Sequence, residues 1–404
     1  MEATVGQMIE STEEKKDSSQ KKKVADGLED KYLAMKAENL PFDVEAWYPL
    51  VSHLTAPTTF LPLSEKEALA IKCYYQTRFA KRNNLTQELA LALRNLRNRI
   101  AESAKASFGS GSFFVRLSSR SPKDGYSHKR PDVVKQIEKA EEQIKVEWKD
   151  VKWPSNIPHE HIDINYKVVA TFRVGSQSLL CPTADHAMSL ILSSERVFHD
   201  INVVLTCAEA ERTREDLTEN WTTKVILRKW QNNIDDLFEF RCFVKDNKLT
   251  AISQYNHYVL VGPLFDENLR ESIRKKLFSY WVKELKTILL EKKDYIVDLA
   301  VLKDGGVYLI ELNPYANTTG PSLYNWNIDK ELLEGRDLQI VGDDHFSYYE
   351  KVPLRIRTEA IPNMDNYVEY MIEQASKEQE EPSYTDLLDE IAPVPKEEKK
   401  CQIF

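Results

Sequence analysis

Apolar residues recur at helical spacing in two long stretches of this 404-residue chain. Residues 64–105 are rich in Ala, Leu and Arg, begin with the capping-box spacing of Ser64 and Glu67, and are interrupted at Asn83-Asn84. This pattern predicts two scaffold helices. A further helix is expected over about residues 267–292, where apolar residues repeat at four-residue steps and predict a core-facing stripe. The stripe consists of Leu269, Ile273, Leu277, Trp281, Leu285 and Leu289.

Short segments rich in β-branched and aromatic residues, each bounded by turn signals, predict strands mainly in the second half of the chain. The segments are KVILRKW, FEFRCFVK, KLTAISQY, YIVDLAVL and VYLIELN. Short strands joined by tight turns favour antiparallel pairing. We therefore expect an α/β (α+β) fold with mostly antiparallel sheets and packed helices.

Both ends of the chain contain few apolar residues. Residues 1–40 are expected to form a mobile tail. Within this tail Leu28, Tyr32 and Met35 stand at helical spacing, which leaves open either a short docked helix or a solvated fringe. Residues 351–404 are rich in Glu and predict an acidic flexible tail. The folded body is then expected over residues 41–350.

Composition and charge exclude several classes of protein. The formal net charge of -9 gives no footprint for non-specific nucleic-acid binding, so no direct nucleic-acid partner is expected. No stretch approaches the roughly 18 apolar residues that span a membrane, and the first residues include no apolar signal region. The cysteines form no CxxC pair, so neither a zinc site nor a disulfide framework is predicted. We expect a cytoplasmic monomer.

A candidate metal site comes from the last two predicted strands, which are joined by KDGG. If Asp304-Gly305 forms the turn, Asp298 lies opposite Glu311, and if Gly305-Gly306 forms it, Asp298 lies opposite Asn313. Either register gathers two carboxylates and one amide oxygen. Strand alternation places four side chains on one face of the second strand. They are Val307, Leu309, Glu311 and Asn313.

Two carboxylates about 5 Å apart repel by roughly 3 kcal/mol at an effective dielectric near 20, so a positive charge is expected between Asp298 and Glu311. Hard oxygen ligands with room left for phosphate oxygens suit Mg²⁺. The alternative is an exposed hairpin on which Lys303 or another cation is the partner.

Candidate phosphate ligands lie in the segment SFFVRLSSRSPKDGY. Arg116 stands inside a strand-like run and is followed by a turn that contains Ser121, Lys123 and Asp124. A buried Arg in such a run needs an anionic partner, and its planar guanidinium matches phosphate oxygens. The alternative is a surface strand with an outward-facing Arg.

Two further segments offer nucleotide contacts. In FEFRCFVK, strand alternation puts Glu239 and Arg241 on the same face, which could line a cleft. The segment VILRKW ends in Arg228, Lys229 and Trp230, where a backbone edge and an aromatic ring could receive an adenine.

Taken together, these segments resemble the cell division cycle protein 123 family, whose members share an ATP-grasp-like fold. The similarity runs over about residues 42–326. It is carried by five motifs in the same order: WYPLVSHLTAPTTFLPL, RLSSRSPKD, LRKW, EFRCFVKDNKLTAISQ and DYIVDLAVLKDGGVYLIELNPY.

The resemblance implies that Asp298, Glu311 and Asn313 bind magnesium, and that Arg116, Arg241 and the LRKW strand bind ATP. Family members are assembly chaperones for the heterotrimeric eukaryotic translation initiation factor 2 and engage its gamma subunit, so the resemblance implies that partner. The chain departs from the family at Arg116, where Lys is more common, and at Glu311, where Asp is common. The helical run after the LPL motif replaces an acidic segment of the family.

Two other functions stay open beside an ATP-binding chaperone, and the sequence does not decide whether the chain is an enzyme. An ATP-grasp ligase that joins a carboxylate to an amine would use the same metal ligands and phosphate cations. An adaptor without nucleotide would use the terminal Cys401-Gln402-Ile403-Phe404, which fits the prenylation pattern. One prenyl group at Cys401 gives only weak membrane association.

Overall fold

Two sheets organise the chain in the computed structural model, which describes residues 27–126, 132–336, 338, 349–361, 364, 366, 368–373 and 383–393. The first sheet is antiparallel with the order β1-β3-β2. The second has the order β7-β6-β4-β5-β8, and only its β5–β8 contact is parallel. The strands are β1 (Thr58–Pro62), β2 (Phe113–Leu117), β3 (Lys224–Lys229), β4 (Glu239–Lys245), β5 (Lys248–Gln254), β6 (Tyr295–Val301), β7 (Val307–Asn313) and β8 (Leu354–Arg355).

All five predicted strands form, as β3 to β7, and the expected α/β fold with mostly antiparallel sheets is confirmed. The β4–β5 hairpin turns at Asp246 and Asn247. Their φ angles of 50° and 56° are positive at both positions, as in a type I′ turn, whose twist matches that of the strands. The likeness to an ATP-grasp fold stays a prediction.

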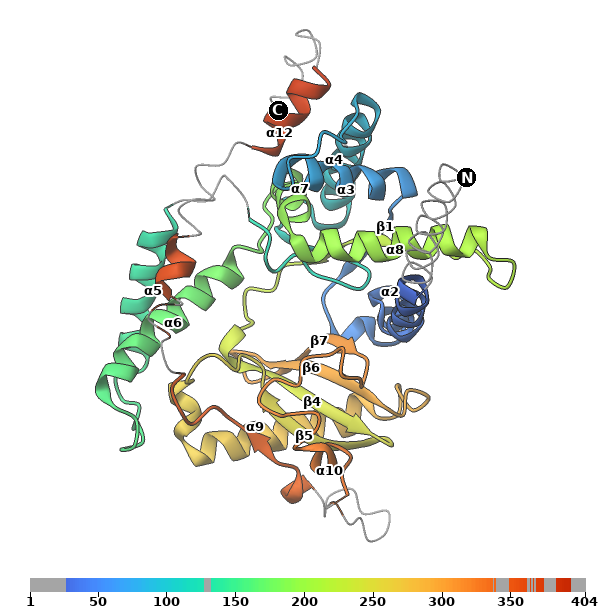
Figure 1. The fold of residues 1–404 in the computed structure, drawn as a ribbon. Helices are drawn as coiled ribbons and strands as arrows, with labels where there is room; N and C mark the ends of the chain where they lie inside the picture. Colours follow the sequence, from blue (N-terminus) through green and yellow to red (C-terminus); the bar gives the residue numbers. More distant parts are fainter. Residues whose placement is uncertain are drawn as a thin grey trace, which may run out of the picture.

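Helices cover the first sheet on one face, as Figure 1 shows for α3, α4, α7 and α8. The predicted division of residues 64–105 is confirmed, because α3 ends before Asn83-Asn84 and α4 begins after it. The capping box of Ser64 and Glu67 is present at the start of α3. The helices are α2 (Val44–Val51), α3 (Glu65–Phe79), α4 (Gln87–Phe108), α5 (Val133–Glu147), α6 (His159–Gln177), α7 (Ala184–Ser193), α8 (Glu195–Thr213), α9 (Glu267–Tyr280), α10 (Lys330–Leu333) and α12 (Tyr384–Ile391).

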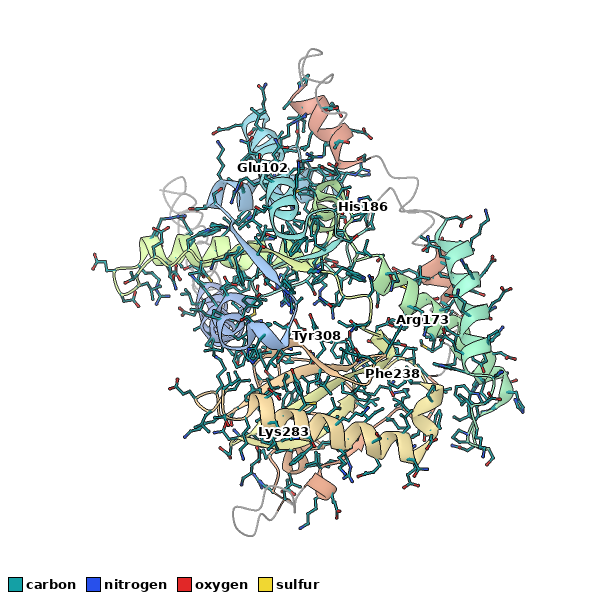
Figure 2. All side chains as sticks on the ribbon, turned by 180° about the vertical axis from the view of Figure 1, so that it is seen from behind. Glu102, Arg173, His186, Phe238, Lys283 and Tyr308 are labelled. Carbon is teal, nitrogen blue, oxygen red and sulfur yellow. The ribbon has the colours of Figure 1, made fainter. Side chains whose placement is uncertain are left out.

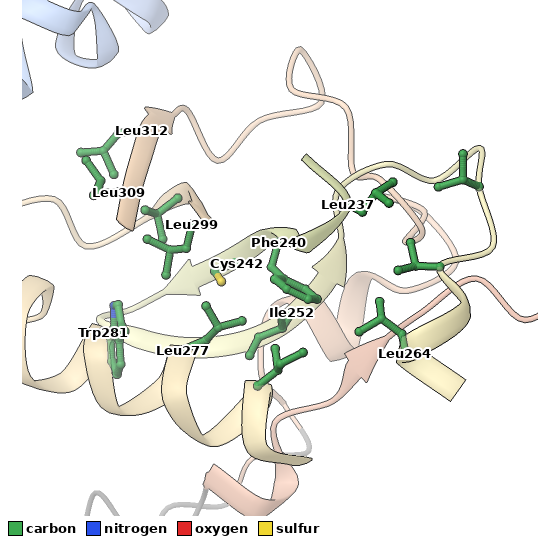
Figure 3. Packing of buried hydrophobic residues seen from close by; sticks show 14 of the residues in the cluster. Leu237, Phe240, Cys242, Ile252, Leu264, Leu277, Trp281, Leu299, Leu309 and Leu312 are labelled. Atoms are coloured by element: carbon green, nitrogen blue, oxygen red, sulfur yellow. The ribbon is translucent and has the colours of Figure 1, made fainter. Parts of the chain in front are cut away.

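The second sheet packs against α9, which lies beneath it in Figure 1. The predicted helix over residues 267–292 is α9 followed by a π-helical turn, Trp281–Leu285, in which the N–H of Lys286 donates to the carbonyl of Trp281. A stripe at strict four-residue steps drifts by about 40° per step around a 3.6-residue helix. The wider π turn offsets this drift, so that Leu285 and Leu289 remain buried in the same core as Leu277 and Trp281, which Figure 3 shows facing the strands.

Segments predicted to be mobile tails contain docked helices. A helix over residues 27–39 contacts α8 through the rings of Tyr32 and His199 and through an ion pair of 2.6 Å between Lys36 and Glu211, which supports the docked-helix alternative. Helix α12 lies inside the expected acidic flexible tail. Its Tyr384 and Leu388 are buried in the core formed by α4 and α7, so this part of the tail is ordered.

Two further expectations concern the chain's class. Within the described ranges, none of the helices is both long enough and apolar enough to cross a membrane. The four cysteines in those ranges are free thiols and buried, in agreement with the absence of a predicted disulfide framework. They are Cys73, Cys181, Cys207 and Cys242.

Candidate functional site

A row of polar and charged side chains crosses the second sheet. The strand register sets Arg241 of β4 beside Asp298 of β6, and Asp298 beside Glu311 of β7. Arg241 donates to both carboxylate oxygens of Asp298, from Nε at 2.8 Å and from Nη2 at 2.7 Å. Asn313 donates from Nδ2 to Asp298 Oδ2 at 3.1 Å. The predicted opposition of Asp298 and Glu311 is therefore confirmed.

The turn that produces this register differs from both predicted turns. The N–H of Leu302 donates to the carbonyl of Gly306 and that of Gly305 to Leu302, so three residues, Lys303 to Gly305, form the loop. Gly305 has a φ of +85°, which glycine adopts without steric cost. This loop alone would set Asp298 against Ile310, but a β-bulge between Leu309 and Glu311 shifts the register by one residue.

The bulge also corrects the predicted faces of β7. Leu309 and Leu312 both lie in the core beneath the second sheet, with Val307 packed against it, although Leu309 and Leu312 are three residues apart. Figure 3 shows the two leucines side by side. The prediction that Val307 and Leu309 share a face with Glu311 and Asn313 is wrong, because the extra residue in the bulge reverses the alternation.

The first sheet supplies Arg116 from its face opposite the helices. On β2, Val115 and Leu117 enter the core formed with α4 and α7, so Arg116 points to the other side. Its Nη1 donates to Glu311 Oε2 at 2.7 Å, and the guanidinium also donates to the carbonyls of Leu117 and Ser119. Arg116 is only 5% exposed, which contradicts the alternative of an outward-facing Arg on a surface strand.

Lys123 and Arg241 approach the same tyrosine. Lys123 Nζ donates to the Tyr255 hydroxyl at 2.8 Å, and both cations lie 4.9 Å from the centre of the Tyr255 ring. The remaining guanidinium nitrogen of Arg241, Nη1, donates to the carbonyl of Gly320. Two cations thus meet one aromatic ring at the edge of the carboxylate row.

The charges in the site shift one another's protonation. Burial opposes ionisation of Glu311, but the nearby Arg116 and Lys123 outweigh burial and lower its pKa to about 2. Burial raises the pKa of Asp298 against the opposing effect of Arg241. Burial, partly opposed by Lys123, raises the pKa of Glu239 to about 8. The arginines therefore supply the positive charge expected between the opposed carboxylates, and the exposed hairpin with Lys303 as partner is excluded.

The donor set fits a hard cation only in part. Among the described residues, no three side chains of His, Cys, Asp or Glu lie close enough to hold a metal ion. A Mg²⁺ here would depend on the second carboxylate oxygen of Glu311, on the amide oxygen of Asn313, and on oxygens of a bound molecule. This arrangement suits an ion shared with phosphates, because Mg²⁺ is commonly held by one or two carboxylates and substrate oxygens.

The D123 family model matches residues 169–386, more than half of the chain. The chain belongs to the D123 family. Curated relatives include "Translation initiation factor eIF2 assembly protein" from Xenopus laevis, 30% identical over 152 residues, and from Danio rerio, 30% identical over 167 residues. "Cell division cycle protein 123" from Candida glabrata is 29% identical over 164 residues. The resemblance deduced from the sequence motifs is thereby confirmed.

The D123 similarity does not extend over whole relatives. The matches cover 37%, 40% and 39% of this chain but only 42%, 44% and 42% of the respective relatives. The solved structure of Cdc123 from Schizosaccharomyces pombe covers 81% of this chain and 98% of its own, at 19% identity and a TM-score of 0.45.

Four predicted nucleotide ligands of this D123 chain lie outside the row. Both oxygens of Asp124 are used at the start of α8, where they accept from Ser194 Oγ at 2.5 Å and from the N–H of Arg196 at 3.0 Å. Ser121 is buried beside them. β3 is the middle strand of its sheet, and the N–H groups of Lys229 and Trp230 donate to Pro57 and Ser112. These two N–H groups are therefore engaged within the first sheet, and an adenine at Arg228, Lys229 and Trp230 stays a prediction.

Sequence reasoning missed two residues that contact the site, Thr55 and Tyr255. Arg228 donates to the carbonyl of Ile310 on β7 at 2.8 Å and to Thr55 Oγ1. Neither Thr55 nor Tyr255 has a sequence signal of its own, since a Thr in a loop and a Tyr at a strand end are common. The position of Tyr255, two residues after Ser253, the register partner of Arg241, could have pointed to it. Cys401 lies outside the described residues.

Proposed function

We propose that this chain binds Mg-ATP between its two sheets, in the manner of an ATP-grasp protein. The proposal rests chiefly on one observation, the row of Arg241, Asp298 and Glu311 on the second sheet, faced by Arg116 of the first sheet at 2.7 Å from Glu311. When bound, Mg²⁺ would neutralise charge between the carboxylates and the phosphates. Glu311 and Asn313 would hold the ion, and Arg116 and Lys123 would bind phosphate oxygens.

The role of each residue follows from its present partners. Asp298 already accepts three hydrogen bonds, so it would mainly fix Arg241 and Asn313. Glu311 accepts one hydrogen bond from Arg116 at one oxygen, which leaves the other oxygen for a cation. Lys123 is hydrogen-bonded to a neutral phenol, and this is a weaker partner than a phosphate. Phosphates would therefore compete well for Lys123 and Arg116.

We further propose that the chain assists assembly of eukaryotic translation initiation factor 2 through its gamma subunit. The names of the relatives support a role in assembly of the initiation factor, and the gamma subunit comes from the family resemblance alone. The matched region is less than half of each relative's length. Because these relatives are named assembly proteins, we favour a nucleotide-dependent chaperone over a ligase. A prenyl group at Cys401 would add weak membrane association to this role.

Calorimetric titration tests the nucleotide site. Mg-ATP is titrated into wild type, Glu311→Gln, and the control Asp304→Asn, which removes one carboxylate from the exposed turn of the same hairpin. We expect saturable binding to wild type and to the control, and at least about tenfold weaker binding to Glu311→Gln. The absence of binding to folded wild type, or equal binding to all three, overturns the nucleotide proposal.

A pulldown with the purified gamma subunit tests the partner separately. We expect the chain to retain the subunit more strongly with Mg-ATP than with EDTA. If wild type binds Mg-ATP but never retains the subunit, the partner proposal fails while the nucleotide site stands. If a carboxylate substrate makes the chain turn ATP over, the chain is a ligase, and the chaperone role is overturned.

A further inference from the structure

The bulge in β7 decides whether Glu311 can reach the site. Without the extra residue, the hairpin pairing that begins at Leu302 and Gly306 would continue unchanged, and Asp298 would face Ile310. Glu311 would then share a face with Leu309 and point into the apolar core. A buried carboxylate in that core would be costly, and the metal ligands would be lost.

Two successive carbonyls at this bulge are held from outside their own sheet. Thr55 Oγ1 donates to the carbonyl of Leu309 at 2.7 Å, and Arg228 Nη1 donates to the carbonyl of Ile310 at 2.8 Å. Arg228 Nη2 also donates to Thr55 Oγ1, which links the two contacts into one chain. A bulge interrupts the ladder hydrogen bonds, so these contacts satisfy carbonyl groups that the sheet leaves without partners.

Burying the charged side chain of Arg228 at this position costs stability. Arg228 is 6% exposed, and no described carboxylate forms an ion pair with it. Its charge is offset by the more distant Glu311, by neutral acceptors and by the ring of Trp47 at 5.7 Å. Its Nε has no hydrogen-bond partner. Burial lowers the pKa of Arg228 accordingly. A buried cation that forms no ion pair is costly, and the hydrogen bonds of Arg228 to Ile310 and Thr55 partly offset that cost.

We propose that Arg228 on β3 and Thr55, in the segment just before β1, are positioning residues that clamp the β7 bulge and thereby aim Glu311 and Asn313 at the metal. This inference rests on the proposed Mg-ATP site, and it changes the role of Arg228 from a nucleotide ligand to a residue that acts through β7. The clamp couples the metal ligands on the second sheet to the position of the first sheet.

The test separates the metal's contribution from that of the nucleotide. ATP affinity is measured with Mg²⁺ and with EDTA for wild type, Thr55→Val, Thr55→Ser, Arg228→Met and the control Thr59→Val, which loses an exposed hydroxyl contact to Ser107. Mg²⁺ should raise the ATP affinity of wild type above its value in EDTA, and we call this ratio the gain from Mg²⁺. In Thr55→Val and Arg228→Met we expect the gain to fall about tenfold, with ATP affinity in EDTA unchanged. Thr55→Ser, which keeps the hydroxyl, and the control should behave as wild type.

Hydrogen exchange gives a readout that does not need bound nucleotide. Amides in residues 307–313 should exchange faster in Thr55→Val than in wild type or Thr55→Ser, because the bulge is no longer held. The clamp is overturned if Thr55→Val keeps the full gain from Mg²⁺, or loses ATP affinity equally in EDTA. If wild type shows no gain from Mg²⁺, the proposed function fails instead, and the clamp stands or falls on the exchange rates alone.

Discussion

The two arginine–carboxylate pairs of the site are built in different ways. Arg241 and Asp298 are register partners on adjacent strands of one sheet and share two hydrogen bonds, at 2.8 and 2.7 Å. Arg116 and Glu311 come from different sheets and share one hydrogen bond at 2.7 Å. Strand pairing fixes the first pair, whereas the second depends on how closely the two sheets approach.

This difference separates a structural pair from an exchangeable one. Asp298 is 1% exposed and has both oxygens occupied, so it cannot leave Arg241 cheaply. Glu311 keeps one oxygen for another partner, and Arg116 is also held by two carbonyls of its own loop. We expect ligands to rearrange the pair between the sheets and to leave the pair within the sheet intact. Figure 2 labels Tyr308 of β7, which marks the region where the two sheets face each other.

The largest effect is expected at Asp298. Asp298→Asn leaves Arg241 buried without an anion, and we expect the free energy of unfolding to fall by about 3 kcal/mol, measured by urea denaturation. Asp304→Asn, at the exposed turn of the same hairpin, should change it by less than about 0.5 kcal/mol. A wild-type midpoint for Asp298→Asn would show that the pair within the sheet is not structural.

Glu239 lies on the same face of β4 as Arg241 but forms no ion pair with an arginine of the described residues. Its protonation therefore shows how burial affects a carboxylate beside the row. Its folded pKa of about 8 lies above the unfolded value, so the folded state holds a proton that the unfolded state releases. Stability from this group is full below about pH 4.5, the ordinary pKa of Glu, and is lost as pH rises toward 8.

We expect wild type to lose on the order of 1–2 kcal/mol more stability between pH 6 and pH 8 than Glu239→Gln does. Urea denaturation of both proteins at the two pH values measures this difference. Identical pH dependence would mean that Glu239 is ionised throughout this pH range.

A double-mutant cycle measures the pair between the sheets. For Arg116→Gln and Glu311→Gln we expect a coupling free energy of unfolding of about 1 kcal/mol, because one charge-assisted hydrogen bond is lost at a partly exposed carboxylate. If this coupling free energy equals the fall in the free energy of unfolding of Asp298→Asn, the pair between the sheets is as structural as the pair within the sheet.

The smallest effect concerns metal binding without nucleotide. Arg116→Gln removes a cation that competes for Glu311, so we expect Mn²⁺ alone to bind about threefold more tightly, as followed by electron paramagnetic resonance. Arg116→Lys keeps the charge and should leave the Mn²⁺ affinity near that of wild type. Weaker Mn²⁺ binding in Arg116→Gln would mean that Arg116 supports the metal ligands instead of competing with the metal.

Local patterns were sufficient for the strands and for part of the site. The five strands were predicted because β-branched and aromatic runs bounded by turns leave few alternatives. The capping box at Ser64 and the opposition of Asp298 and Glu311 followed from spacings of a few residues. The opposition was correct although the predicted turn was not, because a three-residue loop and a one-residue bulge offset each other.

By itself, the sequence determined the β6–β7 hairpin and the trio of Asp298, Glu311 and Asn313 on it, because neighbouring strands joined by a short turn pair with each other. Only the tertiary structure decided which cations meet that trio. Arg241 reaches Asp298 because β4 pairs with β6 across about fifty intervening residues, and Arg116 reaches Glu311 because a second sheet packs nearby. The bulge that turns Glu311 toward them is held by Thr55 and Arg228. Contacts so distant in sequence depend on packing, which local spacing does not encode.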